Sequence, residues 1–393
     1  MKYEYDDQKE ILTIYPEGRI DSDNAAVFGQ ELDAARRAYP DGRIVFDMDR
    51  LDYLSSAGLR VFLNLAQKEK HRMSAINASS DVMDIFRMTG FDTIIDISQK
   101  MRRVSTDGCE IIGRGANGIV YRLDPDTIIK VFRPDADLAV VERERKKSHA
   151  ALISELPTAI SYDVVRAGDC YGIVYEMINS KSLADVMRED EAHFDRYAEA
   201  YTSLYKKIHS TEGDMETFGS VKTIYEEAID YCSDVYTREE LEKLRALIRS
   251  VPDRVTLIHG DYHPGNIMLI DDELTLIDMG DVSLGHPVFD FLETAAVQIN
   301  LVKLDPVFAQ QFTGMPAQMI TRLWNTLLEG CFAGKSREEI LRIDRRISGF
   351  SKLKVALAPY FARDIDDKVI RASIEDAKTN LFPVMDDLMK WEE

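Results

Sequence analysis

Residues 257–268 read LIHGDYHPGNIM, and residues 274–280, a second apolar stretch that carries an aspartate, read LTLIDMG. Two predicted apolar strands enclose a loop of His, Asp, Gly and Asn, and such loops gather polar groups at a site. Asp261 can accept the proton of an attacking hydroxyl group or orient that group. Asn266 and Asp278 offer the hard oxygen ligands that magnesium prefers. The stretch therefore predicts phosphoryl transfer, which depends mainly on positioning and on neutralising charge.

An ordinary polar loop is the alternative interpretation of this stretch. It would require H-G-D-x-H-x-x-N and a later D-x-G to arise together by chance, at a separation that suits a shared site. The catalytic interpretation explains both motifs at once, and we favour it.

A glycine-rich motif, GRGANGIV at residues 113–120, fits G-x-G-x-x-G-x-V. Glycines at Gly113, Gly115 and Gly118 would let the backbone approach phosphates closely and adopt positive φ. The shorter G-x-G-x-x-G pattern also marks dinucleotide sites, where it joins a strand to a helix. Here the next predicted element is a strand, which favours a kinase-type nucleotide loop.

Lys130 lies twelve residues after Gly118, in the apolar strand TIIKV at residues 127–131. Burying a lone cation costs several kcal/mol, so a buried Lys130 needs partners. An edge-strand lysine that reaches solvent is the alternative. The functional interpretation pairs it with the α- and β-phosphates and with a carboxylate from the next helix. Glu144 is the expected partner and Glu142 the second choice, although this charged run could also be a solvated helix face.

The region before residue 98 alternates predicted strands and helices, which implies one small α/β sheet domain. The expected elements are a strand at 11–15, a helix at 25–38, a strand at 43–48, a turn at 53–58, a helix at 59–70, a strand at 73–77 and a helix at 80–88. The segment 98–108 is polar, basic in the middle and ends in a glycine, and residues 98–106 are interpreted as a linker.

The region after the linker begins with strands and continues with helices. We expect three short strands within 110–132, a helix at 138–152, and strands at 159–165 and 171–177. From residue 183 onward the pattern is helical except at 255–281. The predicted domains are therefore 1–97, a linker at 98–106, a β-rich lobe at 107–178 and a mostly helical lobe at 179–393, which together make a bilobal α+β fold.

The amino-acid composition limits the kinds of partner and the cellular location that we expect for this protein. The formal net charge of −20 argues against nucleic acid or an anionic membrane as the main partner, because both require basic patches. A cationic substrate or a basic protein partner is compatible with it. The four cysteines show no metal-binding spacing, and the acidic N-terminus lacks a signal peptide's apolar run. No stretch approaches the ~18 apolar residues of a membrane span, so we expect a cytoplasmic protein.

Residues 107–393 resemble the aminoglycoside phosphotransferase and choline kinase family, whose signature is H-G-D-x-H-x-x-N. The resemblance implies a protein-kinase-like fold that uses ATP and Mg²⁺. It implies a catalytic base at Asp261, metal ligation by Asn266 and Asp278, and phosphate binding by Lys130. The acceptor would be a hydroxyl group, or an amine, of a small molecule.

The same resemblance assigns supporting roles. His259 and His263 would brace the catalytic loop, although an ordinary core role for these histidines is equally compatible with the sequence. Asp290 matches the family aspartate that supports this loop. Glu176 and Ile178 lie where the two lobes join, and their backbone groups would hold the edge of the adenine ring.

Residues 1–97 resemble the STAS domain of anti-sigma-factor antagonists. The matching segments are GRID and NA at 18–21 and 24–25, DYLSSAGL at 52–59 and IFRMTGF at 85–91. In that family a serine or threonine at the start of the following helix accepts phosphate from a partner kinase, and Ser56 occupies this position. The usual Asp before it is replaced by Ser55, so Ser56 is either a phosphorylation site or only a helix N-cap.

Three functions fit these motifs. The first is a small-molecule kinase with a STAS regulatory or docking domain, which the catalytic signature favours. The second is a protein kinase of a partner-switching pathway that acts on Ser56 or on a STAS-like protein partner. The third is a nucleotide-dependent interaction module. Homodimers are compatible with each, and fold alone does not choose the substrate.

Overall fold

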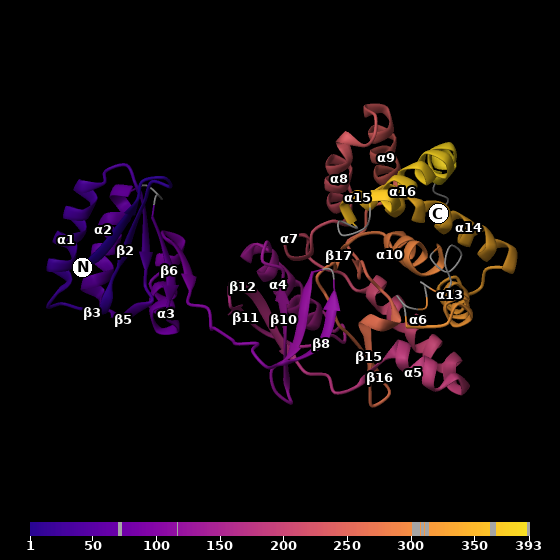
Figure 1. The fold of residues 1–393 in the computed structure, drawn as a ribbon, viewed down its shortest axis with the longest axis horizontal. Helices are drawn as coiled ribbons and strands as arrows, with labels where there is room; N and C mark the ends of the chain where they lie inside the picture. The colour runs from indigo at the N-terminus through magenta and orange to yellow at the C-terminus, as the bar shows by residue number, and fades with distance from the viewer. Residues whose placement is uncertain are drawn as a thin grey trace. The chain divides into compact units, whose positions relative to one another are not determined.

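The computed structural model describes residues 1–69, 73–115, 117–300, 307, 310, 314–361 and 367–390. The chain divides into two compact units, Met1–Arg103 and Val104–Glu393. The first is a mixed α/β sheet domain and the second has a β-rich lobe followed by a helical lobe (Figure 1). The predicted α/β domain followed by a bilobal α+β fold is confirmed.

The first unit is built on a sheet in the order β1-β2-β4-β6-β7. These strands are β1 (Lys2–Asp6), β2 (Ile11–Tyr15), β4 (Arg43–Asp47), β6 (Met73–Ala78) and β7 (Asp96–Gln99). β1 pairs antiparallel with β2, and the other neighbours pair in parallel. A separate parallel pair joins β3 (Glu17–Ile20) to β5 (Arg50–Leu54).

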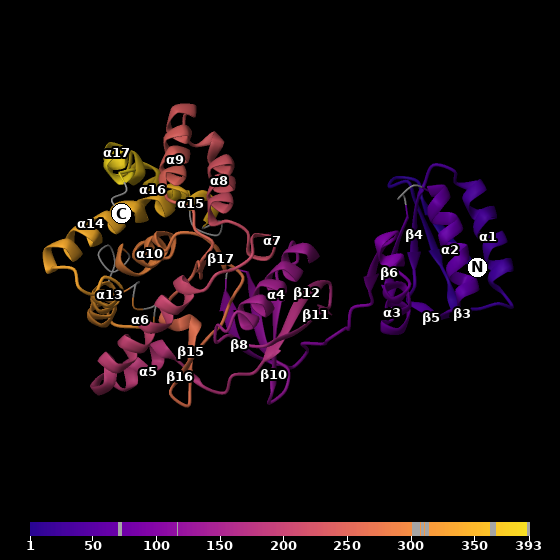
Figure 2. The ribbon, with the colours of Figure 1, turned by 180° about the vertical axis from the view of Figure 1, so that it is seen from behind.

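Three helices cover the apolar side chains of this sheet. They are α1 (Ala25–Ala38), α2 (Ser56–Glu69) and α3 (Ser80–Met88), and α1 lies beside α2 in both views (Figures 1 and 2). Phe46 of β4, Phe62 of α2 and Phe86 of α3 are fully buried and contact one another through Phe62. Burial of each such side chain contributes about 1.5–3 kcal/mol, so this aromatic cluster holds the helices on the sheet.

Some predicted boundaries in this unit were wrong. The sequence pattern missed β1, β3, β5 and β7, since short strands with exposed residues carry little apolar alternation. Residues 53–54 belong to β5 and α2 begins at Ser56, so the predicted turn is shorter than residues 53–58. The predicted end of this helix, at residue 70, lies outside the described residues.

The second unit begins with an antiparallel sheet in the order β11-β12-β10-β9-β8. Its strands are β8 (Glu110–Gly115), β9 (Gly118–Arg122), β10 (Thr127–Phe132), β11 (Ser161–Ala167) and β12 (Cys170–Glu176). Helix α4 (Leu138–Ile153) packs against β11 and β12. This is the predicted strand-rich lobe, with the last two strands shifted by one or two residues.

The segment predicted as a linker, 98–106, is partly structured. β7 continues to Gln99, so the first two linker residues belong to the first unit. Val104 donates its backbone N–H to the carbonyl of Arg166 at 2.8 Å and packs on a small apolar cluster that includes Ile129 and Val165. Val104 is therefore part of the second unit, a role that the polar composition of the segment concealed.

The rest of the second unit is mostly helical (Figure 2). Its helices are α5 (Leu183–Glu189), α6 (Phe194–Ser210), α7 (Met215–Phe218), α8 (Val221–Tyr231), α9 (Arg238–Ser250), α10 (Val288–Thr294), α13 (Ala317–Cys331), α14 (Arg337–Ala356), α15 (Ala358–Phe361), α16 (Asp367–Asn380) and α17 (Met385–Leu388). Its short strands are β13 (Lys181–Ser182), β14 (Leu257–Ile258), β15 (Ile267–Ile270), β16 (Glu273–Leu276) and β17 (Ser283–Leu284). The break in the helical pattern thus extends a few residues beyond the predicted 255–281.

Two apolar cores of the helical lobe enclose the stretch at 257–284. One core joins α6 and α13 with Tyr262 and Ile267, and the other joins α8, α9, α10 and α14 with Ile258. Strands β14, β15 and β16 are thereby fixed on the lobe, and the polar loop between them is held at its ends. Within the described ranges, no helix has the length and apolar character needed to cross a membrane.

Candidate active site

Lys130 lies at the centre of the residues predicted from the sequence. Its Nζ donates to Glu144 Oε1 at 2.9 Å and to Asp278 Oδ1 at 2.7 Å. The Lys130 side chain is only 11% exposed, so the lysine does not reach solvent as an edge-strand residue would. Burial opposes its charge, but the carboxylates of Asp278 and Glu144 outweigh burial and raise the pKa of Lys130. Lys130 is therefore a fixed cation between the two lobes.

The pairing expected for Glu144 is present, whereas Glu142 is exposed on the other side of α4. Glu144 also accepts a hydrogen bond from Tyr175 Oη at 3.1 Å. One helical turn further on, the buried Lys147 donates to the carbonyl of Gly280 at 3.1 Å. Helix α4 therefore holds both Lys130 and the segment that carries Asp278.

The glycines of the motif at 113–118 are needed for a different reason from the one predicted. None of Gly113, Gly115 and Gly118 has a positive φ, so the expected left-handed backbone is wrong for the described residues. A Cβ at Gly118 would lie 2.1 Å from the carbonyl oxygen of Val131, which excludes any side chain there. A Cβ at Gly115 would meet nothing within 4 Å, so open space lies beside this backbone.

Glu176 and Ile178 lie at the junction of the lobes, at the end of β12. The Glu176 carboxylate, rather than its carbonyl, accepts the N–H of Ile160 at 2.7 Å, and the Glu176 N–H bonds to the Ile160 carbonyl. The Ile178 carbonyl accepts the N–H of Ser180 at 2.9 Å. No hydrogen bond to the Ile178 N–H occurs among the described residues, so this donor is available to a ligand.

Asp261 and Asn266 contact each other directly in the polar loop. Asn266 Nδ2 donates to Asp261 Oδ2 at 2.9 Å and to the Asp261 carbonyl at 3.1 Å. His263 Nδ1 accepts the N–H of Gly265, which leaves Nε2 as the protonated nitrogen, 3.7 Å from Asp261 Oδ2. His263 thus braces the short 3₁₀ turn Pro264–Asn266 and faces the carboxylate.

The Asp261 carboxylate is ionised and keeps access to solvent. Burial alone would raise its pKa, but His263 and Asn266 favour the charged form and lower the pKa to about 2. The side chain is 47% exposed. Asp261 is therefore a carboxylate at neutral pH that a substrate hydroxyl group can reach.

The residues predicted to bind metal have suitable free oxygens. Both hydrogen bonds of the Asn266 side chain use Nδ2, so Oδ1 is the atom left to ligate a cation. The Asn266 carbonyl accepts the N–H of Ile277 at 2.9 Å, which links it to the residue before Asp278. Mg²⁺ commonly takes one or two protein oxygens together with phosphate and water, so this pair fits it. No cluster of three or more His, Cys, Asp and Glu that could hold a metal occurs in the described part of the chain.

The polar loop around Asp261 is supported from beneath by Asp290. The two oxygens of this fully buried carboxylate accept the N–H groups of His259 and Gly260 at 2.8 and 2.7 Å. His209 Nε2 lies 2.9 Å from Asp290 Oδ2. Burial opposes ionisation of Asp290, but His209 and the two backbone donors outweigh it and lower the pKa. Asp290 therefore fixes the backbone at residues 259–260, and its expected role in supporting a catalytic loop stays a prediction.

Three residues of this arrangement were missed in the sequence. They are His209, Tyr175 and Lys147, and none of them lies in a recognisable motif: Lys147 belongs to the charged run ERERKK, and His209 follows two lysines and an isoleucine. His259 is fully buried, and its Nδ1 accepts the N–H of Asp261 at 3.3 Å, while its Nε2 has no hydrogen-bond partner among the described residues. His259 therefore supports the loop from inside the core.

Ser56 lies in the first unit and is exposed at the first position of α2. The N-cap is Ser55, because Ser55 Oγ accepts the N–H of Gly58 at 3.3 Å and the Ser55 carbonyl accepts the N–H of Leu59. The interpretation of Ser56 as an N-cap is therefore wrong. An exposed hydroxyl in the first helical turn is suited to carry negative charge.

The fold and the convergent residues define a kinase-like phosphotransferase joined to a STAS domain. Residues 108–319, more than half of the chain, match the model of the phosphotransferase enzyme family, and the protein belongs to this family. Residues 4–97 match the STAS domain model described as Mlab, STAS domain.

Individual proteins resemble each part. A proposed anti-sigma factor antagonist, BtrV of Bordetella bronchiseptica, is 33% identical over 101 residues, which cover 25% of this chain and 86% of that protein. The ADP-bound aminoglycoside phosphotransferase APH(2'')-Ib is 15% identical with a TM-score of 0.46, over 77% of this chain and 96% of its own. A choline/ethanolamine kinase family protein from Mesorhizobium loti is 12% identical with a TM-score of 0.44, over 72% and 90% of the two chains.

Proposed function

We propose that residues 104–393 transfer the γ-phosphoryl group of ATP to a hydroxyl group of a small molecule, with Mg²⁺. The observation that carries this proposal is the position of Lys130, bonded to both Glu144 and Asp278 although Asp278 is 148 residues away in the chain. A fixed cation beside a prospective metal ligand is what a nucleoside triphosphate requires. Family membership supports phosphotransfer but not a particular acceptor.

Each residue then has a defined task. Lys130 binds the α- and β-phosphates, and the N–H of Ile178 and carbonyl of Glu176 hold the adenine edge. The backbone beside Gly115 leaves room for a phosphate. When bound through Asn266 Oδ1 and the Asp278 carboxylate, magnesium would neutralise phosphate charge.

The reaction places the acceptor oxygen against Asp261. The hydroxyl donates its proton toward the Asp261 carboxylate, its oxygen bonds to the γ-phosphorus, and the bond from that phosphorus to the β-γ bridging oxygen breaks. ADP leaves with the bridging oxygen, and the proton passes from Asp261 to solvent. Asp290 keeps the loop backbone in place, since it accepts two of its N–H groups.

The test is incubation with γ-labelled ATP and magnesium, with and without a panel of small hydroxyl and amino-hydroxyl compounds, followed by mass spectrometry. We expect label to transfer to at least one compound with the wild type and not with Asp261→Asn. Asp271→Asn is the matched control, because Asp271 is exposed on the turn between β15 and β16. Equal transfer by Asp261→Asn would refute the assignment of the base.

A second function, phosphorylation of Ser56, is favoured by one observation. Ser55 supplies the helix cap, so the Ser56 hydroxyl is exposed and free of that task. The similarity of this unit to a proposed anti-sigma factor antagonist supports a protein partner for the STAS domain. Intact-mass measurement after exposure to ATP and magnesium tests it: a gain of one phosphate in wild type that is absent in Ser56→Ala is expected. Equal phosphate in Ser56→Ala would rule this serine out.

A further inference from the structure

Ile128, Arg122 and Glu110 lie opposite one another on three neighbouring strands of the β-rich lobe, two residues along β10 from Lys130. In the pairing of β9 with β10, Lys130 faces Val120 and Ile128 faces Arg122. Arg122 also pairs with Glu110 of β8. Side chains two residues apart on a strand point to the same side, so Arg122 shares the face that carries Lys130. It lies roughly 7 Å further along the strand, toward the junction of the lobes.

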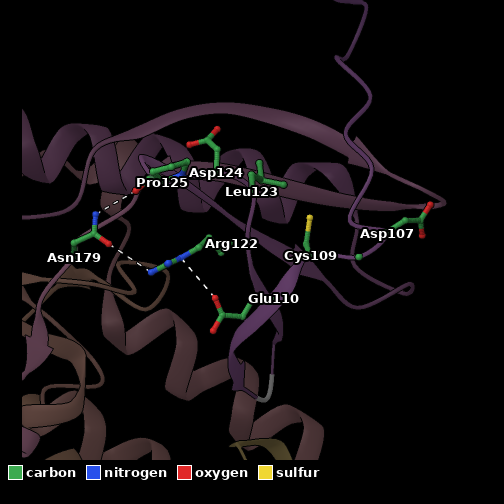
Figure 3. Close-up of a pocket in the computed structure, with 9 residues that line it drawn as sticks. Asp107, Cys109, Glu110, Arg122, Leu123, Asp124, Pro125 and Asn179 are labelled. Carbon is green, nitrogen blue, oxygen red and sulfur yellow. Dashed lines mark hydrogen bonds and ion pairs between the residues drawn. The ribbon is translucent and has the colours of Figure 1, made fainter.

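The Arg122 guanidinium is poorly satisfied by the protein. Nη2 lies 3.5 Å from Asn179 Oδ1, at the limit of a hydrogen bond, and Nε lies 3.9 Å from Glu110 Oε2, beyond one. Nε is buried and has no hydrogen-bond partner in the described part of the chain. Figure 3 shows the guanidinium between the side chains of Glu110 and Asn179. A buried guanidinium N–H without an acceptor costs free energy that a ligand oxygen could recover.

Two cavities adjoin this guanidinium. One, of about 430 Å³, is lined by Glu110, Arg122 and Asn179 together with the chain at 107–109 (Figure 3). The other, of about 520 Å³, is lined by Arg122 and Val186 and by four residues near the junction of the lobes, Met177, Asn179, Ser180 and Lys181. Both volumes lie within the range of small-molecule sites. Arg122 and Asn179 line both cavities.

We infer that Arg122 binds the ribose hydroxyl groups of the nucleotide, an inference that rests on the proposed use of ATP. A nucleotide extended from Lys130 to the N–H of Ile178 passes its sugar between these two points. Arg122 shares the face of Lys130 and contacts Asn179, the residue after Ile178. Guanidinium donors match hydroxyl oxygens, and Asn179 and Glu110 hold the planar group at this position.

A purely structural role is the competing explanation, in which Arg122 ties β8 and β9 to the interlobe segment. Such a tie would be expected to show short, well-directed hydrogen bonds, and the contacts at 3.5 and 3.9 Å are weak. The cavities on both sides also remain without a function in that explanation.

The test compares ATP, 2',3'-dideoxy-ATP and inorganic tripolyphosphate, each with magnesium, by titration calorimetry. We expect Arg122→Met to bind ATP about tenfold more weakly than wild type, and tripolyphosphate within twofold. Loss of the ribose hydroxyls should weaken wild type by a similar factor and Arg122→Met very little. Arg122→Lys retains the charge and should resemble Arg122→Met, if the fork of donors is what matters.

Arg166→Met is the matched control, because Arg166 lies on β11, stacks on Tyr171 and donates to the carbonyl of Asp169. It should bind all three ligands as wild type does. The inference is overturned if Arg122→Met binds ATP normally, loses tripolyphosphate equally, or discriminates against the dideoxy nucleotide as wild type does. Absence of ATP binding in wild type would instead overturn the proposed function.

Discussion

The two units use buried charge differently. In the first unit, Arg36 and Glu69 form a buried ion pair. Arg36 Nη1 also donates hydrogen bonds to the carbonyls of Tyr39 and Gly42. In the second unit, the buried charge of Lys130 continues to Asp278, whose carboxylate is 43% exposed. A buried ion pair is therefore not by itself a mark of a functional site. The mark is a buried charge that fixes a group still open to solvent.

Among the substitutions that test this difference between the units, a change at Asp261 should have the largest effect on turnover. Asp261→Asn retains the shape and the hydrogen bond to Asn266 but loses the base, so kcat should fall by about 10²–10⁴-fold with ATP affinity retained. Steady-state kinetics with the acceptor found in the labelling experiment measures this. Turnover within about tenfold of wild type, a change of ~1.4 kcal/mol, would contradict it.

The pH dependence of Asp261 follows from its pKa of about 2, below the ordinary 3.8. The folded state therefore binds this proton less well than the unfolded state does. Its contribution to stability is present above pH ~4 and is lost as the pH falls toward 2. The rate should accordingly show no acid limb from Asp261 between pH 5 and 8.

Removal of Asp278 should abolish magnesium-dependent nucleotide binding. Asp278→Ala deletes a proposed metal ligand and one partner of Lys130, while Glu144 still holds the lysine. Calorimetric titration of ATP with and without magnesium should show no difference in affinity for this variant. An undiminished magnesium effect would move the metal site elsewhere.

Removing one buried carboxylate from each unit sharpens the comparison between them. Asp290→Ala and Glu69→Ala each leave a buried cationic or donor group unpaired and should cost about 3 kcal/mol of unfolding free energy. Because a two-unit protein need not unfold in one step, each transition should be followed separately. Only the Asp290 change should also lower kcat. Equal activity losses would mean that the distinction between the two units fails.

Domain separation tests the proposed boundary near the linker. A protein that begins at Val104 should fold, because this residue completes the apolar cluster and the hydrogen bond to Arg166. One that begins at Ser105 should also fold but be less stable by about 1 kcal/mol. Thermal unfolding of the two proteins compares them. Aggregation of both, relieved by adding residues 1–97, would mean that the units share an essential apolar surface.

The smallest expected effect separates two neighbouring serines. Ser55→Ala removes the cap of α2 and should cost about 1 kcal/mol, whereas Ser56→Ala should lie within about 0.5 kcal/mol of wild type. Urea denaturation of the first unit measures both. The reverse order would return the capping role to Ser56.

Much of this arrangement could be predicted from the sequence. Motifs that are local in the chain, such as the loop around Asp261 and the strand around Lys130, indicated their chemistry through residue type and spacing. Glu144 was favoured over Glu142, and the structure pairs Glu144 with Lys130.

What the sequence could not provide was mostly long-range. His209 approaches Asp290 from 81 residues away, and no motif marks a single histidine at the end of a helix. Gly118 is required by the carbonyl of Val131, an effect of strand packing rather than of phosphate binding. Ser55 caps the helix through one hydrogen bond, which it accepts from Gly58. The sequence alone does not show which of the two adjacent serines makes this bond.

The Asp290 contacts also have a consequence for the order in which the chain assembles. They close loops of about 30 and 81 residues at one carboxylate, and closing such loops costs chain entropy before any bond forms. The backbone at residues 259–260 should therefore reach its final form only after α6 and α10 have docked. During refolding, recovery of helical circular dichroism should precede recovery of phosphotransfer. Simultaneous recovery would mean that the loop forms early, together with the helices.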